Sequence, residues 1–203
     1  TADMLEAAWS PKTRLLVLNS PLNPSASMIG AEELAVIARF CTTRDLIAIC
    51  DEVWEELVFD GARHVPLIGQ PGMRERTITI SGLSKTFSCT GWRLGYIVAP
   101  EAQTAAIRKV HDFLTVGAPA PLQAAGAVGM HFDADYFNHL ALDYRGRRTL
   151  ICDALSEAGF RYTQPEGAYY VLADFSELSN MDDVTFAKWM CEEIGVATVP
   201  GSS

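Results

Sequence analysis

Short apolar runs that end in polar or turn residues alternate with stretches of helical periodicity in the first half of the chain. The runs cover residues 14–19, 46–50, 77–80 and 94–98, and apolar residues recur at helical spacing over 31–44. A short apolar run closed by turn residues predicts a buried strand. Strands that are apolar on both faces and alternate with helices indicate an α/β fold, with a mostly parallel sheet flanked by helices.

The second half of the chain has a different order of predicted elements. We expect helices over 100–114, 124–130 and 133–158, then a strand over 169–174 and a helix over 184–194. Gly159 follows the longest of these helices and is a typical C-terminal cap. The mixture of helix and strand indicates a smaller α+β domain, so we expect a large domain at 1–132 and a small domain at 133–203.

Composition and charge exclude several classes of protein. Of the 203 residues, 49% are hydrophobic and 20% are charged, which is typical of a globular protein with a sizeable core. The net charge of −9 and the scattered lysines and arginines argue against nucleic acid and anionic lipid as partners. The chain contains neither an apolar run long enough to span a bilayer nor the pattern of a signal peptide. We therefore expect no membrane partner.

The cysteines point to a reducing compartment. The chain has five, an odd number at wide spacing: Cys41, Cys50, Cys89, Cys152 and Cys191. Such a set fits the cytoplasm better than a disulfide framework. No two cysteines have the spacing of zinc ligands, and no metal site is predicted.

Polar residues follow three of the predicted strands. Asn23, Asp51 and Lys85 each come just after a strand end, and in parallel sheets ligands bind beyond the carboxyl ends of the strands. A carboxylate after a buried strand is costly without a cationic partner. The placement of these residues predicts one shared site.

The segment 81–95, Ser-Gly-Leu-Ser-Lys-Thr-Phe-Ser-Cys-Thr-Gly-Trp-Arg-Leu-Gly, carries the most specific chemistry. A buried lysine amine such as that of Lys85 can attack a carbonyl, and a guanidinium such as that of Arg93 can hold a phosphate through two hydrogen bonds. Pyridoxal phosphate (PLP) has both an aldehyde and a phosphate. The segment therefore favours a PLP site.

Together with Asn-Ser-Pro-Leu-Asn-Pro-Ser at 19–25 and Asp-Glu-Val-Trp at 51–54, this segment resembles the class I/II aminotransferases, PLP enzymes of fold type I. The resemblance implies that Lys85 forms the Schiff base with PLP and then moves a proton at the substrate. It also implies that Asp51 pairs with the pyridinium nitrogen, that Asn23 bonds the phenolic oxygen, and that Arg93 binds the phosphate. Asn19 is expected to be structural.

The chain departs from the family pattern at two cofactor positions. Trp54 stands where the family usually has a tyrosine that contacts the phenolic oxygen, and indole donates only one hydrogen bond. Gly82 stands where many members have a phosphate-binding serine, so Ser81 or Ser84 is expected to substitute. Tyr169 and Tyr170 are expected to be core residues, with a position at the substrate mouth as the alternative.

The resemblance covers essentially the whole chain, which nevertheless lacks segments that the family uses, so we expect a partial chain. The implied activity is the transfer of an amino group from an amino acid to a 2-oxo acid by a homodimer. Two alternatives stay open at this point. One is a PLP-dependent C–S β-lyase, and the other is a regulatory domain that binds PLP without turnover.

Overall fold

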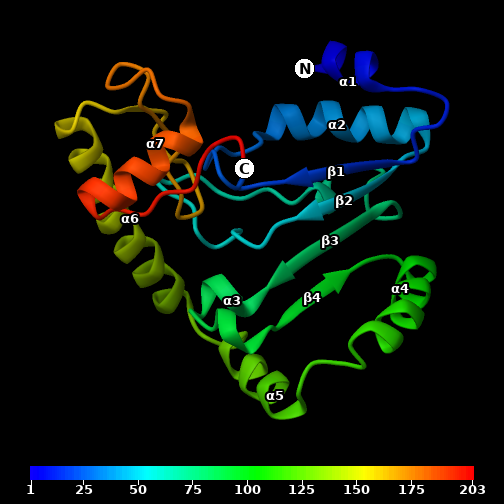
Figure 1. Ribbon diagram of the computed structural model, residues 1–203. Helices are drawn as coiled ribbons and strands as arrows, with labels where there is room; N and C mark the ends of the chain where they lie inside the picture. Colours follow the sequence, from blue (N-terminus) through cyan, green and yellow to red (C-terminus); the bar gives the residue numbers. More distant parts are fainter.

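The computed structural model describes residues 1–203 and contains a four-stranded sheet in its first half (Figure 1). The strands lie in the order β1 (Leu15–Asn19), β2 (Ile47–Asp51), β3 (Thr77–Gly82) and β4 (Gly95–Val98). β1, β2 and β3 are parallel, whereas β4 runs antiparallel to β3. The four strands predicted in the first half of the chain and the mostly parallel α/β fold are confirmed.

Seven α-helices accompany the sheet. They are α1 (Ala2–Ala8), α2 (Ala31–Arg44), α3 (Leu83–Thr86), α4 (Glu101–Leu114), α5 (Ala120–Gly129), α6 (Ala134–Glu157) and α7 (Asp183–Trp189). Short 3₁₀ turns lie at η1 (Leu67–Gly69) and η2 (Thr90–Trp92), and α7 continues into a π-helical turn, η3 (Met190–Ile194). None of the helices has the length and apolar character that crossing a membrane would require.

The main core lies between α2 and one face of the sheet. Leu34 and Cys41 of α2 pack with Ala48 and Cys50 of β2 in a cluster of buried apolar residues. The opposite face of the sheet is more open, and Val17 of β1 is 68% exposed there. Burial therefore differs between the two faces, although the strands are apolar on both.

The helix predicted over 124–130 starts four residues earlier. Pro119 is the N-cap of α5, and Pro121 lies in its first turn. The first turn of a helix tolerates proline because its N–H groups have no partner inside the helix. The two prolines therefore lie at the start of a helix and do not interrupt it.

The strand predicted over 169–174 is largely wrong. Only Ala173–Asp174 forms a strand, β6, which pairs antiparallel with β5 (Arg161–Tyr162). The backbone just before it bonds to loops instead of a ladder: Gly167 N donates to Ala26 O at 3.1 Å, and Ala168 N donates to Leu57 O at 2.8 Å. These bonds fix the segment against the first half of the chain.

α6 connects the two halves. It starts after its N-cap Asp133 and runs for 24 residues from the vicinity of α5 toward α7 (Figure 1). The small two-stranded sheet and α7 follow it. The division at residue 132 stays a prediction, and it coincides with the start of this helix.

Candidate active site

The carboxyl ends of β1, β2 and β3 lie along one edge of the sheet, with α3 directly after β3 (Figure 1). Asn19 and Asp51 are register partners at this edge. The Asn19 amide donates from Nδ2 to the Asp51 carbonyl oxygen at 3.0 Å and accepts the Asn23 backbone N–H at 2.9 Å. Asn19 is therefore structural, as expected, and it joins Asn23 to Asp51.

The Asp51 carboxylate has no basic partner in the chain. It is half-buried, and its Oδ1 accepts the Val53 backbone N–H at 3.3 Å. None of the ion pairs in the structure includes it. A half-buried carboxylate without a cation is costly, so the position favours a cationic ligand group.

Lys85 lies on the single turn of α3, three residues after the end of β3. Its ammonium group donates a hydrogen bond to Tyr169 Oη at 2.9 Å. The same nitrogen lies 5.0 Å from the ring centroid of Trp54 and 5.2 Å from that of Tyr169, within the range of cation–π attraction. An amine from the first half of the chain is thus held by an aromatic residue from the second half.

Trp54 is the buried aromatic residue beside Lys85. It is 2% exposed and contacts Tyr169 and Tyr170 edge-on, with ring centroids 4.3 and 5.3 Å away. Its indole N–H makes no hydrogen bond within the chain, so the donor is available to a ligand. The packing fixes the orientation of this donor next to Lys85.

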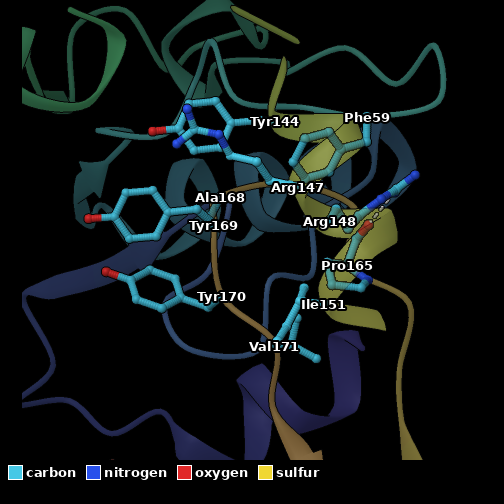
Figure 2. Close-up of a pocket in the computed structure, with 10 residues that line it drawn as sticks. All are labelled: Phe59, Tyr144, Arg147, Arg148, Ile151, Pro165, Ala168, Tyr169, Tyr170 and Val171. Atoms are coloured by element: carbon cyan, nitrogen blue, oxygen red, sulfur yellow. Dashed lines mark hydrogen bonds between the residues drawn. The ribbon is translucent and has the colours of Figure 1, made fainter. Parts of the chain in front are cut away.

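A cavity of about 410 Å³ adjoins Tyr169 (Figure 2). The hydroxyls of Tyr144, Tyr169 and Tyr170 point to the same side in this view, whereas Arg148 turns the other way. Arg148 donates to Pro165 O at 2.8 Å and pairs with Asp60 at 2.8 Å. Three aromatic rings therefore shape the side of the cavity that leads to Lys85.

Two side chains around this cavity have shifted pKa values. Burial is the main cause that raises the pKa of the Tyr170 hydroxyl, and the neighbouring Tyr169 adds to it. The hydrogen bond from Arg148 lowers the pKa of the Asp60 carboxyl. Tyr170 lines the cavity directly, whereas Asp60 is connected to it only through its ion pair with Arg148.

The predicted phosphate ligands lie apart from the Lys85 contacts. Arg93 follows η2 and donates to Thr90 O at 3.3 Å, and it lines a second cavity, of about 910 Å³, together with Ser81. The Ser81 hydroxyl is buried and donates to Glu55 at 2.6 Å. Ser84 accepts hydrogen bonds through its carbonyl from Cys89 N and Thr90 Oγ1. The structure brings Ser81 and Arg93 to one cavity, and Lys85 does not line it.

Sequence reasoning underestimated Tyr169. The residue was expected in the core, yet it is 45% exposed and is the hydrogen-bond partner of Lys85. The two residues are 84 positions apart, so no local spacing connects them. The adjacent aromatic residues Tyr169 and Tyr170 were the one available signal.

Comparison with known proteins identifies the family. The family model described as "Aminotransferase class I and II" matches residues 1–203. A probable N-succinyldiaminopimelate aminotransferase, DapC, from Mycobacterium tuberculosis is 40% identical over 202 residues, which are 100% of this chain and 51% of that protein. The methionine aminotransferase of Escherichia coli is 37% identical over 96% of this chain and 50% of its own length. The chain therefore spans about half the length of these curated relatives.

Solved structures agree with this result. The N-succinyldiaminopimelate aminotransferase structure from Mycobacterium tuberculosis superposes with a TM-score of 0.96 at 40% identity, over 100% of this chain and 53% of that chain. The Escherichia coli structure YbdL, described as having a methionine aminotransferase function, gives a TM-score of 0.93 at 36% identity over 98% of this chain and 52% of its own. The family model covers the whole chain, and the chain belongs to the class I and II aminotransferase family.

Proposed function

We propose that this chain carries the cofactor-binding centre of a PLP-dependent aminotransferase, which transfers an amino group from an amino acid to a 2-oxo acid. The observation that carries the proposal is that two neighbouring strands, β2 and β3, end at the same edge of the sheet. Asp51 ends β2 without a basic partner, and the parallel neighbour β3 leads directly into the turn that bears Lys85. A carboxylate without a basic partner and a primary amine without an acidic partner, at one sheet edge, are the two groups that PLP needs most.

The residues present fit this cofactor. PLP supplies an aldehyde that condenses with an amine and a protonated ring that withdraws electrons from the substrate carbon. The partnerless carboxylate of Asp51 fits the ring cation, and the free indole N–H of Trp54 fits the ring oxygen. Asn23 is tied to Asp51 through Asn19 and offers an amide at the same edge. Each of these groups lacks a competing partner of the required kind in the chain.

Lys85 does two things in the proposed reaction. Its amine is the covalent anchor of the cofactor, and once released it carries a proton to and from the substrate carbon. Tyr169 holds the amine at 2.9 Å and the face of Trp54 confines it, so the nitrogen has a restricted set of positions. Arg93 and Ser81 are proposed phosphate ligands, supported by the cavity they share, with Ser84 as the alternative hydroxyl.

We propose an amino acid and a 2-oxo acid as substrates, and we propose a homodimer in a reducing compartment such as the cytoplasm. The compartment is supported by the cysteines, which are all free thiols, three of them buried. For the substrate we propose the class named by the relatives, an amino acid with an extended side chain such as N-succinyldiaminopimelate or methionine. The aromatic cavity beside Tyr169 supports an extended side chain.

The test is a visible absorbance spectrum of the full-length gene product with PLP, before and after N-succinyldiaminopimelate, methionine, aspartate and kynurenine are added. A yellow band that bleaches with at least one amino acid and returns with a 2-oxo acid is expected. Lys85→Ala should lose the band, whereas Lys188→Ala, on the exposed side of α7, should keep it. A normal band in Lys85→Ala would overturn the assignment.

The same samples separate the two alternatives. Release of pyruvate and ammonia from cystathionine, with no 2-oxo acid present, would replace the transferase proposal by a C–S β-lyase. A band that responds to no amino acid would favour a domain that binds PLP without turnover.

A further inference from the structure

Beside the cofactor edge, three metal-ligating side chains lie together that the proposed transferase chemistry does not use. Glu52 directly follows β2, Glu55 lies in the next turn, and His64 lies in the loop that leads to η1. One ligand atom from each residue lies within 4.8 Å of the other two. We propose that these residues form a binding site for one divalent transition-metal ion of the zinc type.

The imidazole of His64 carries the strongest argument. Its side chain is 10% exposed, and its Nε2 is buried without a hydrogen-bond partner. Nε2 nevertheless lies 3.1 Å from Glu52 Oε2, and the Glu52 side chain is itself 5% exposed. The 3.1 Å contact lacks the direction of a hydrogen bond, and its length also fits two atoms that bind one ion. In a tetrahedral zinc site, neighbouring ligand atoms are about 3.4 Å apart.

Glu55 is oriented by its own partners. Its Oε1 accepts hydrogen bonds from Ser81 Oγ at 2.6 Å and from Tyr96 Oη at 2.9 Å. The second carboxylate oxygen accepts no hydrogen bond within the chain and is available to an ion. Hydrogen bonds of this kind to a metal-binding carboxylate fix its direction and are typical of metal sites in proteins. Ser81 thus has a role here even without a contact to phosphate.

The ligand set selects the kind of ion. Two carboxylates neutralise a charge of +2, and an imidazole ligand favours zinc over magnesium, which prefers an octahedron of oxygen atoms. Three protein ligands leave the fourth tetrahedral position to water. The site lies one residue from Asp51, but its ligands are different residues from Asp51 and Lys85, so a metal ion does not occupy the carboxylate and the amine proposed for the cofactor.

The experiment is equilibrium dialysis of the full-length protein, stripped with a chelator, against Zn²⁺ and separately against Mg²⁺. We expect one Zn²⁺ per chain and no Mg²⁺. Glu52→Gln and His64→Gln should each weaken zinc binding by about 10-fold or more. The control is His139→Gln, which changes an exposed histidine of α6 and should leave the affinity unchanged. Melting curves of the stripped variants check that each is folded.

Cobalt(II) substitution distinguishes this site from a cysteine site. A site of two carboxylates and one imidazole gives visible d–d bands without the near-ultraviolet charge-transfer band of a cobalt–thiolate bond. A thiolate band would overturn the proposal, because a cysteine would then be a ligand. Failure of the wild-type protein to bind Zn²⁺ would also overturn it and leave Glu52 and His64 as a buried ion pair. Equal Zn²⁺ affinity of the wild type and His64→Gln would also overturn the proposal.

Discussion

Tyr169→Phe tests the contact that joins the two halves of the site. The change removes only the oxygen that accepts the 2.9 Å hydrogen bond from Lys85. A hydrogen bond to a charged group contributes about 1.5–3 kcal/mol when both partners are buried. Tyr169 is 45% exposed, so water replaces part of the interaction. We therefore expect a loss of about 1 kcal/mol, equivalent to a fall in kcat/KM of about fivefold.

The assay is amino-group transfer by the full-length protein with its best amino acid, measured together with thermal unfolding. The ring of Tyr169 stays in place against Trp54 and Tyr144, so the melting temperature should fall by no more than about 4 °C. The matched control is Tyr144→Phe, which removes a hydroxyl from the same cavity without removing a partner of Lys85. Equal kcat/KM in both variants, or an unchanged kcat/KM in Tyr169→Phe, would refute the positioning role of the Tyr169 hydroxyl.

Three further predictions follow from individual side chains. Asp51→Asn should keep the fold and lower kcat by about 100-fold, the size typical of losing one preorganised electrostatic contact; a near-normal kcat would contradict the ring-nitrogen role. Burial, with Glu52 nearby, raises the pKa of the Cys50 thiol to about 12, so thiol reagents at pH 8 should label Cys191 and spare Cys50, as peptide mapping can show. The pKa of Asp60 is lowered by Arg148, so its stabilising effect is complete above about pH 4 and is lost as the pH falls further; thermal unfolding of Asp60→Asn should depend less on pH in that range.

The sheet was predictable because its signal is local. Each strand of the first sheet is a short apolar run that ends at a polar or turn residue, and the structure places these ends within one or two residues of the prediction. The direction of β4 was not predictable in this way. Only twelve residues, 83–94, separate β3 from β4, and they form α3 and η2. A connection of this length is at the lower limit for a crossover between parallel strands, so it permits either direction for β4.

The side of the site formed by the second half of the chain could not be obtained from local patterns. Tyr169 reaches Lys85 because the backbone after Pro165 bonds to Ala26 and Leu57, not to a neighbouring strand. Gly167 permits this approach, since a Cβ there would lie 2.8 Å from the ring of Pro21. These contacts join distant segments, and the periodicity of the segment still resembles that of a strand. The aromatic residue was therefore assigned to a core instead of to the amine.

Asp51 and Glu52 show why two adjacent acids in a sequence are not a catalytic pair. Successive side chains of an extended chain point to opposite sides, and the backbone stays extended here, because Glu52 N still donates to Ile80 O of β3 at 2.8 Å. Asp51 is half-buried and has no basic partner, whereas Glu52 is 3% exposed and lies against His64. The end of β2 thus supplies one carboxylate, Asp51, to the proposed cofactor site and another, Glu52, to the proposed zinc site. The pair of substitutions Asp51→Asn and Glu52→Gln should separate them, with the first lowering kcat and the second lowering zinc affinity.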